Sequence, residues 1–125
     1  MLKNSLDYRL IINSNSVNYE YLKEKVYDEI RNEISDILDF IRCYEEEDYI
    51  IVYEMCEVAE IWIDATAGTE YKKHSEAVIM ARQLVRTLVN SMFYNRSFEI
   101  SSSAKTSIIV KNIIAYLSSF SEEVK

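Results

Sequence analysis

The sequence contains no proline and only one glycine, Gly68, among its 125 residues. Folds built from β-strands and tight turns use both residue types repeatedly, because these residues supply a fixed or a positive φ angle. Their scarcity therefore favours helices. It also excludes two kinds of nucleotide-binding loop, the P-loop and the GxGxxG turn, since neither can be built with a single glycine.

Histidine is equally scarce, with His74 the only one in the chain. Nucleophilic catalysis needs a nucleophile with a base in reach, and His74 lies in a polar stretch, residues 70–75, where we expect an exposed side chain. Carboxylate metal sites in helical bundles take histidines from two helices, so one histidine cannot complete such a set. We therefore assign no catalytic residue, no metal ligand and no cofactor. Cys43 and Cys56 show no CxxC spacing and are expected to be free.

Long apolar runs are also missing. The longest candidate, residues 49–63, is interrupted by three glutamates and falls short of the roughly 18 apolar residues that span a bilayer. Near the N-terminus, Asp7 and Arg9 stand where a signal peptide would carry its apolar stretch. We therefore expect a cytoplasmic protein, in the producing cell or in an infected host, with no membrane partner.

The chain does contain ample apolar material and an excess of acidic residues. Hydrophobic residues make up 49% of it, and its length fits one helical domain over residues 1–125. The formal net charge is −7. Residues 1–66 carry 16 acidic and 6 basic side chains, whereas residues 67–125 carry 5 and 8. Because a negative chain is repelled by the phosphate backbone, we expect no direct binding to nucleic acid.

Apolar residues at steps of three and four predict four helices. The clearest spans residues 18–43, where one apolar stripe faces inward and acidic residues fill the remaining positions. Further helices are predicted over residues 49–65 and 75–95, and a last one begins at Thr106 or Ser107. The predicted fold class is all-α or predominantly α, a bundle of about four helices. The stripe of the first helix consists of Leu22, Val26, Ile30, Ile34, Ile37 and Ile41.

Three short segments are ambiguous. Residues 5–13 alternate apolar and polar side chains as a half-buried strand does, yet their leucines also recur at helical spacing. A short N-terminal β-strand is slightly favoured there by β-branched and aromatic content. Residues 48–53 fit a buried strand as well as the start of a helix. Residues 97–101 are expected to be extended, after Asn95 has ended the preceding helix in the left-handed conformation.

Acidic side chains gather on the outer face of the first helix and on one edge of the second. This surface, with ten tyrosines in the chain, favours protein–protein association, since tyrosine is enriched at interfaces. We expect a small non-enzymatic inhibitor, adaptor or immunity-type protein, of a kind typical of a virus, phage or mobile element. It would form a homodimer and bind a basic partner protein. The residues predicted to bind that partner are Glu29, Glu33, Asp36, Glu46, Glu47, Glu57 and Glu60.

Two other functions stay open at this level. Glu45, Glu46, Glu57 and Glu60 loosely match the paired carboxylates of a metal-dependent helical hydrolase, although the spacing between the pairs is short. Alternatively, the wide apolar face of residues 49–63 would line a cavity instead of a dry core. The chain would then be a sensor domain that binds an apolar ligand.

Overall fold

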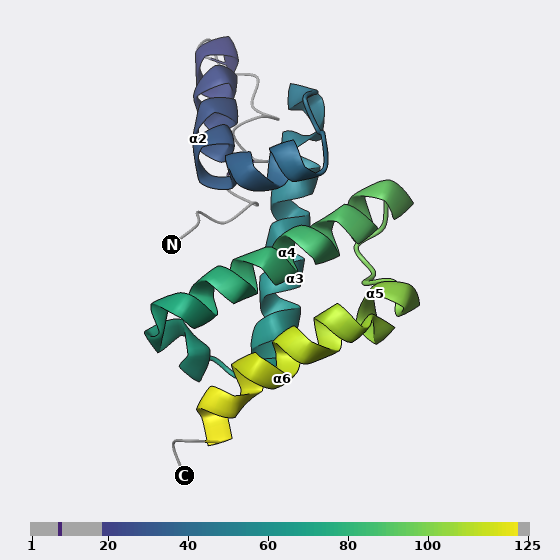
Figure 1. The fold of residues 1–125 in the computed structure, drawn as a ribbon. Coiled ribbons are helices and arrows are strands. Elements are labelled where there is room, and N and C mark those ends of the chain that lie inside the picture. Colours follow the sequence, from purple (N-terminus) through teal and green to yellow (C-terminus); the bar gives the residue numbers. More distant parts are fainter. Residues whose placement is uncertain (1–7, 9–18, 123–125) are drawn as a thin grey trace. The chain divides into compact units, whose positions relative to one another are not determined.

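The computed structural model describes Tyr8 and residues 19–122, and this part of the chain is helical (Figure 1). Five α-helices and two short 3-10 helices follow one another in it without a strand, which confirms the predicted all-α class. None of these helices is long and apolar enough to cross a membrane. In chain order they are α2 (Tyr19–Phe40), η1 (Glu46–Asp48), α3 (Tyr49–Ala67), η2 (Glu70–Lys73), α4 (Ser75–Asn95), α5 (Ser102–Thr106) and α6 (Ile108–Glu122).

The ambiguous segments have different outcomes. Of residues 5–13 only Tyr8 is described, and it is helical; the predicted N-terminal strand otherwise lies outside the described residues. Residues 48–53 belong to the end of η1 and the start of α3, so a strand there is wrong. Of residues 97–101, between α4 and α5, residues 97–99 form bends and only Ser101 is recorded as extended, with φ −63° and ψ 151°. The hydroxyl of Ser101 then caps α5 by accepting a 3.2 Å hydrogen bond from the amide of Ala104.

The contacts of the chain gather in two compact units, Met1–Glu54 (unit 1) and Met55–Lys125 (unit 2), and the boundary lies within α3. Charge divides with the units, because unit 1 holds 13 acidic and 6 basic side chains whereas unit 2 holds 8 of each. The whole net charge of −7 therefore belongs to unit 1. A single folding domain over residues 1–125 stays a prediction.

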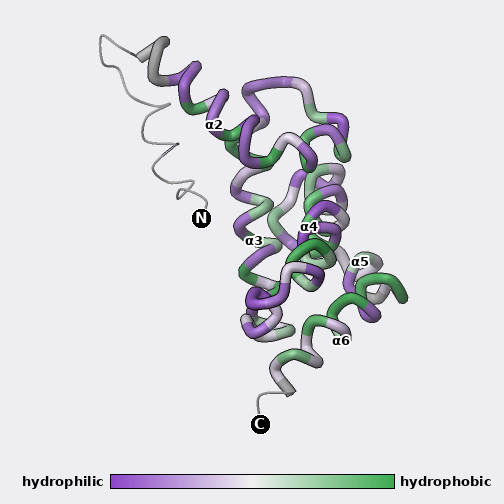
Figure 2. The backbone as a smooth tube through the Cα atoms, turned by 60° about the vertical axis from the view of Figure 1, so that its left-hand side comes forward, coloured by the Kyte–Doolittle hydropathy of each residue, from purple (hydrophilic) through white to green (hydrophobic). Residues whose placement is uncertain are grey.

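Unit 1 is built on the apolar stripe of α2. Hydrophilic and apolar residues alternate along this helix in the hydropathy colouring (Figure 2), as expected for a helix with one buried face. Ile34 has φ −125° and ψ 26°, so two helical segments meet at a kink there. From Val26 onward the stripe is confirmed by the burial of Val26, Ile30, Ile34, Ile37 and Ile41, which share the core of the unit with Val52 and Tyr53 of α3. The side chain of Leu22, the first residue of the predicted stripe, is not among those that the structure describes.

Two helices end at an arginine in the left-handed conformation. Arg42 follows α2 with φ 57°; its amide donates to the carbonyl of Asp39 at 3.2 Å, and the amide of Cys43 donates to the carbonyl of Leu38 at 2.9 Å. These two bonds form the Schellman motif, which usually takes glycine at this position. Helix α4 ends in the same way at Arg96, φ 50°, one residue later than the sequence pattern predicted.

In unit 2, α4 and α6 lie side by side and η2 contacts both (Figure 1). Helix α3 ends at Gly68, which has φ 81° and donates its amide to the carbonyl of Asp64 at 3.0 Å. A Cβ atom at this position would overlap the hydroxyl of Ser121 on α6. That hydroxyl donates a 3.2 Å hydrogen bond to the carbonyl of Ala67. The single glycine therefore allows α6 to approach the end of α3.

Candidate functional site

The last residue of α2 and the segment that connects α2 with α3 carry exposed aromatic and acidic side chains together. Phe40 and Tyr44 expose 47% and 69% of their surface, and Glu45, Glu46 and Glu47 are exposed beside them. We call these five residues the acidic corner. An exposed tyrosine offers a large apolar area with a polar tip, which is the kind of side chain that anchors interfaces.

Buried neighbours fix the backbone of the acidic corner. Ile41 and Cys43 are buried, so residues on either side of each are turned outward. The Schellman bonds at Arg42 hold the exit from α2. The amide of Asp48 then donates to the carbonyl of Glu45 at 3.0 Å and starts η1. The exposed side chains are therefore presented from an ordered turn.

Arg31 of α2 reaches the acidic corner from within unit 1. Its guanidinium lies 2.8 Å from the carboxylate of Asp28 and 3.6 Å from that of Glu46. It also lies 5.5 Å from the centre of the Tyr49 ring, which meets the ring of Tyr27 edge-on at 6.0 Å. Arg31 thus partly balances the charge of Glu46. Both side chains are exposed, and ion pairs between exposed side chains are weak.

The predicted acidic face of α2 is less open than its sequence pattern suggested, because Glu29, Glu33 and Asp36 are all half-buried. Glu33 accepts a 2.9 Å hydrogen bond from the hydroxyl of Tyr53, and the Tyr53 ring meets the ring of Tyr8 edge-on at 5.2 Å. Burial raises the pKa of Tyr8, and the charges of Glu33 and Glu29 raise it further. Glu33 and Glu29 therefore lie close to buried tyrosines.

In unit 2, the acidic edge of α3 meets basic and phenolic groups. The carboxylate of Asp64 accepts 2.6 Å hydrogen bonds from the hydroxyl of Tyr71 and from the ammonium group of Lys72. Burial raises the pKa of Glu60, although the charges of Arg82 and Lys72 act in the opposite direction. This edge is therefore partly neutralised by η2 and α4.

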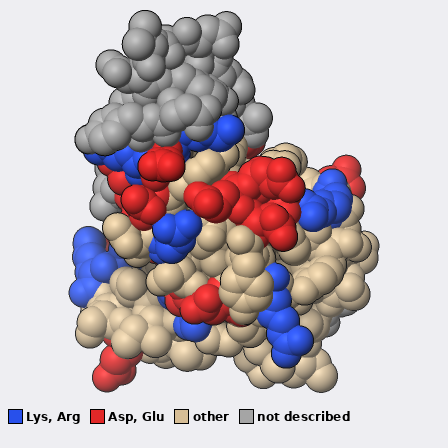
Figure 3. All heavy atoms as spheres, turned by 90° about the horizontal axis from the view of Figure 1, so that it is seen from above, with Lys and Arg blue, Asp and Glu red and all other residues tan. Residues whose placement is uncertain are grey.

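The seven predicted binding residues thus fall into separate groups. Glu46 and Glu47 belong to the acidic corner, and the three α2 carboxylates are half-buried in the same unit. Glu57 and Glu60 are half-buried on α3 in unit 2. On the face seen in Figure 3, Asp and Glu side chains form separate groups with Lys and Arg beside them. The helical phase of a sequence does not show these differences, because tyrosines and lysines approach from other elements.

Within the described residues, no group of three or more His, Cys, Asp or Glu side chains could hold a metal ion. The four carboxylates considered for a hydrolase divide between the units, Glu45 and Glu46 in unit 1, Glu57 and Glu60 in unit 2. The described geometry therefore gives the hydrolase alternative no support.

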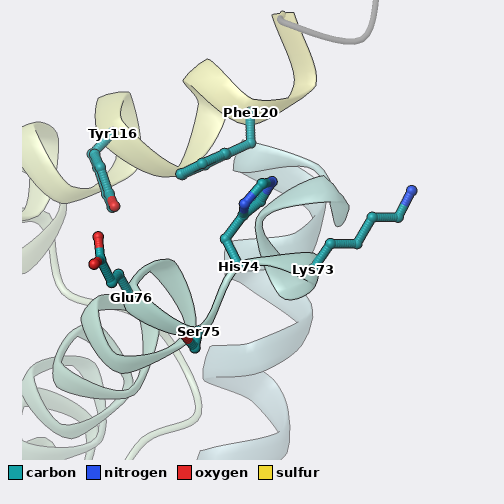
Figure 4. A pocket seen from close by; sticks show the side chains of 6 residues that line it. All are labelled: Lys73, His74, Ser75, Glu76, Tyr116 and Phe120. Atoms are coloured by element: carbon teal, nitrogen blue, oxygen red, sulfur yellow. The ribbon is translucent and has the colours of Figure 1, made fainter.

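His74 is one of the residues that line a shallow pocket of about 330 Å3 in unit 2 (Figure 4). Its imidazole is exposed, as predicted, and stacks on the ring of Phe120 with 4.4 Å between centroids. The Tyr116 ring meets Phe120 edge-on at 5.3 Å, and the carboxylate of Glu76 points toward Tyr116 (Figure 4). Lys73 points away from these rings (Figure 4) and pairs with Glu70 at 2.8 Å. The pocket offers an aromatic surface and not a matched acid and base.

A second open surface of unit 2, which we call the α3 groove, has a volume of about 350 Å3. Ile61 of α3 and Phe98 of the segment after α4 both line it and expose 68% and 45% of their surface. The sequence pattern missed this groove, because the residues after α4 that form its second wall lie more than thirty positions further along the chain. Its lining includes Val58, Ile61, Trp62 and Ala65 of α3, with Phe98 and Lys105 from the segment after α4.

Comparison of the chain with protein-family models, with curated proteins and with solved structures gives no match. Its function therefore has to be inferred from these surfaces.

Proposed function

We propose that this chain is a non-enzymatic protein-interaction module, acting as an inhibitor, adaptor or immunity-type protein, that binds a basic segment of a partner protein at the acidic corner. The observation that carries this proposal is the exposure of Tyr44 and Phe40 beside three consecutive glutamates. A surface of this composition offers a cationic side chain both carboxylates and aromatic faces.

The charge division between the units supports a basic partner. Unit 1 carries the full net charge of −7 while unit 2 is neutral, so the attractive field for a cation originates in the unit that holds the acidic corner. Fields of this kind accelerate encounter and weaken as salt increases, because exposed charges are screened over about 8–10 Å at ordinary ionic strength. We therefore expect fast and salt-sensitive association.

The aromatic residues of the acidic corner would supply most of the affinity. Exposed ion pairs contribute little each, whereas a tyrosine that becomes buried at the centre of an interface is often a hot spot. Of the two aromatic residues of the acidic corner, Tyr44 is more exposed than Phe40. A cationic side chain lying over its ring would add about 0.5–1 kcal/mol, and more once water is excluded.

The experiment uses a fluorescein-labelled amphipathic peptide of lysine and leucine, with a glutamate–leucine peptide of the same length as its control. We expect the lysine peptide alone to bind the full chain, with a Kd that rises with sodium chloride. Tyr44→Ala should weaken binding by more than about tenfold, and exchange of Glu45, Glu46 and Glu47 for glutamine should remove most of the salt dependence.

Tyr94→Ala is the matched control, because Tyr94 of α4 exposes 64% of its surface and lies in the neutral unit. It should leave the Kd unchanged. Equal binding by wild type, Tyr44→Ala and the triple glutamine variant, or a Kd indifferent to salt, would show that the acidic corner is not the binding surface.

A further inference from the structure

The pocket of unit 2 that His74 lines, which we call the aromatic pocket, brings three rings together (Figure 4). The rings of Tyr116 and Phe120 meet at 84° with 5.3 Å between their centroids. Two rings at such an angle form a corner whose two sides are ring faces. The imidazole of His74 stacks on Phe120 at 4.4 Å and adds a third ring to the group. Because the face of an aromatic ring is partly negative, this corner attracts cations.

The charges around the aromatic pocket also favour a cation over an anion. Glu76 lines the pocket, and its carboxylate points toward Tyr116 (Figure 4). Among the described residues, Glu76 takes part in no ion pair. Lys73 lines the pocket too, but it points away from the rings (Figure 4) and pairs with Glu70 at 2.8 Å. The uncompensated charge beside the rings is therefore the negative charge of Glu76.

An apolar hollow adjoins the aromatic pocket. It has a volume of about 450 Å3 and shares Glu76 and Tyr116 with the pocket. Ile79 and Met80 of α4 complete its lining and expose 66% and 38% of their surface. A ligand whose cationic group lies against the rings can therefore extend an alkyl chain over these two side chains.

We infer that the aromatic pocket binds a small quaternary ammonium compound that carries an alkyl chain. The ammonium group contacts the rings of Tyr116 and Phe120 beside Glu76, and the chain covers Ile79 and Met80. A quaternary ammonium group suits such a corner because its positive charge is spread over methyl groups that make no hydrogen bonds to water, so little hydration is lost on contact with the rings. This site is separate from the acidic corner, which belongs to unit 1.

The experiment follows the amide resonances of the full chain by NMR during titration with hexyltrimethylammonium. We expect saturable shifts at residues 74–80 and 116–120. Two further probes are matched to the first: hexanesulfonate has the same chain with the opposite charge, and tetramethylammonium lacks the chain. Each of these two should bind more weakly than hexyltrimethylammonium by more than about tenfold.

Two variants test the groups that select the cation. Glu76→Gln should raise the Kd for hexyltrimethylammonium by about threefold to tenfold, and Phe120→Leu should raise it by about tenfold. Glu99→Gln is the matched control, because Glu99 is also an exposed glutamate of unit 2 and does not line the aromatic pocket. It makes the same change of net charge and should leave the Kd unchanged. Circular dichroism verifies that the variants are folded.

Absence of saturable shifts, or shifts confined to unit 1, would overturn the inference. Equal affinity for hexanesulfonate, or equal effects of Glu76→Gln and Glu99→Gln, would show that the pocket does not select a cation. Equal affinity for tetramethylammonium would contradict the role of the apolar hollow. Tyr44→Ala should leave the Kd for hexyltrimethylammonium unchanged, and Glu76→Gln should leave that for the lysine peptide unchanged, so this inference and the proposed function fail separately.

Discussion

The hydroxyl of Tyr53 donates a 2.9 Å hydrogen bond to the carboxylate of Glu33, twenty residues earlier in the chain. Tyr53 is fully buried and Glu33 is half-buried, so this bond ties α2 to α3 at the edge of the unit 1 core. The bond also explains why the Glu33 carboxylate is half-buried within unit 1 and not fully exposed on its surface.

Removing this hydroxyl should destabilise the protein. In Tyr53→Phe the ring still fills its space, but Glu33 loses a donor, and we expect the free energy of unfolding to fall by about 1–2 kcal/mol in urea titrations. Tyr44→Phe is the control, because Tyr44 is largely exposed, and its effect should stay within about 0.5 kcal/mol. Equal stability of the two variants would show that the Tyr53 bond contributes nothing.

Alkaline pH should destabilise unit 2 through Tyr71. Burial raises the pKa of this phenol, and the hydrogen bond to Asp64 raises it further. A group whose pKa is higher in the folded state keeps its full contribution below the unfolded value, about 10 for tyrosine, and loses it as pH rises above that value. Unfolding measured between pH 8 and pH 11 should therefore show falling stability.

Tyr71→Phe should have a shallower decline of stability above about pH 10, since the titrating group is gone. Tyr44→Phe, which removes an exposed tyrosine, should keep the wild-type slope. A Tyr71→Phe curve parallel to that of wild type would assign the alkaline loss to other groups.

Gly68→Ala should be strongly destabilising for two separable reasons. The positive φ of 81° strains any residue with a Cβ atom, and that atom would also overlap the Ser121 hydroxyl. We expect a loss of about 1–3 kcal/mol in thermal or urea unfolding. In a Ser121→Ala background the added cost of Gly68→Ala should be smaller, because only the backbone strain remains. An equal cost in both backgrounds would mean that the side-chain overlap is relieved without energy.

The two left-handed arginines should respond differently to glycine. Arg42→Gly relieves the strain at φ 57° and should stabilise the protein by about 0.5–1 kcal/mol after the entropy cost of glycine. Arg96→Gly relieves similar strain but removes a guanidinium that lies 4.4 Å from the centre of the Phe93 ring, so its gain should be smaller. Urea unfolding of the two variants tests the order, and a larger gain at Arg96 contradicts it.

The sequence by itself determined the four longer helices, α2, α3, α4 and α6, and the buried stripe of α2, but not the short helices α5, η1 and η2. The stripe residues from Val26 to Ile41 are buried at the predicted steps of three and four, namely Val26, Ile30, Ile34, Ile37 and Ile41. That spacing is a local property of one helix. The scarcity of glycine and proline likewise indicated the all-α class. The exposure of Glu46 and Glu47 followed from their place in a short acidic connector.

Only the tertiary structure decided which acidic side chains are exposed to solvent and which are hydrogen-bonded within the protein. Glu33 and Asp64 meet Tyr53 and Tyr71, and helical phase carries no information about a phenol that arrives from another element. The α3 groove likewise needs a second wall, which Phe98 and Lys105 supply from after α4. An apolar stripe that includes Ile61 and Trp62 is predicted from the sequence to be buried. Whether it is buried depends on which other elements pack over it, and the sequence pattern of one helix does not contain that information.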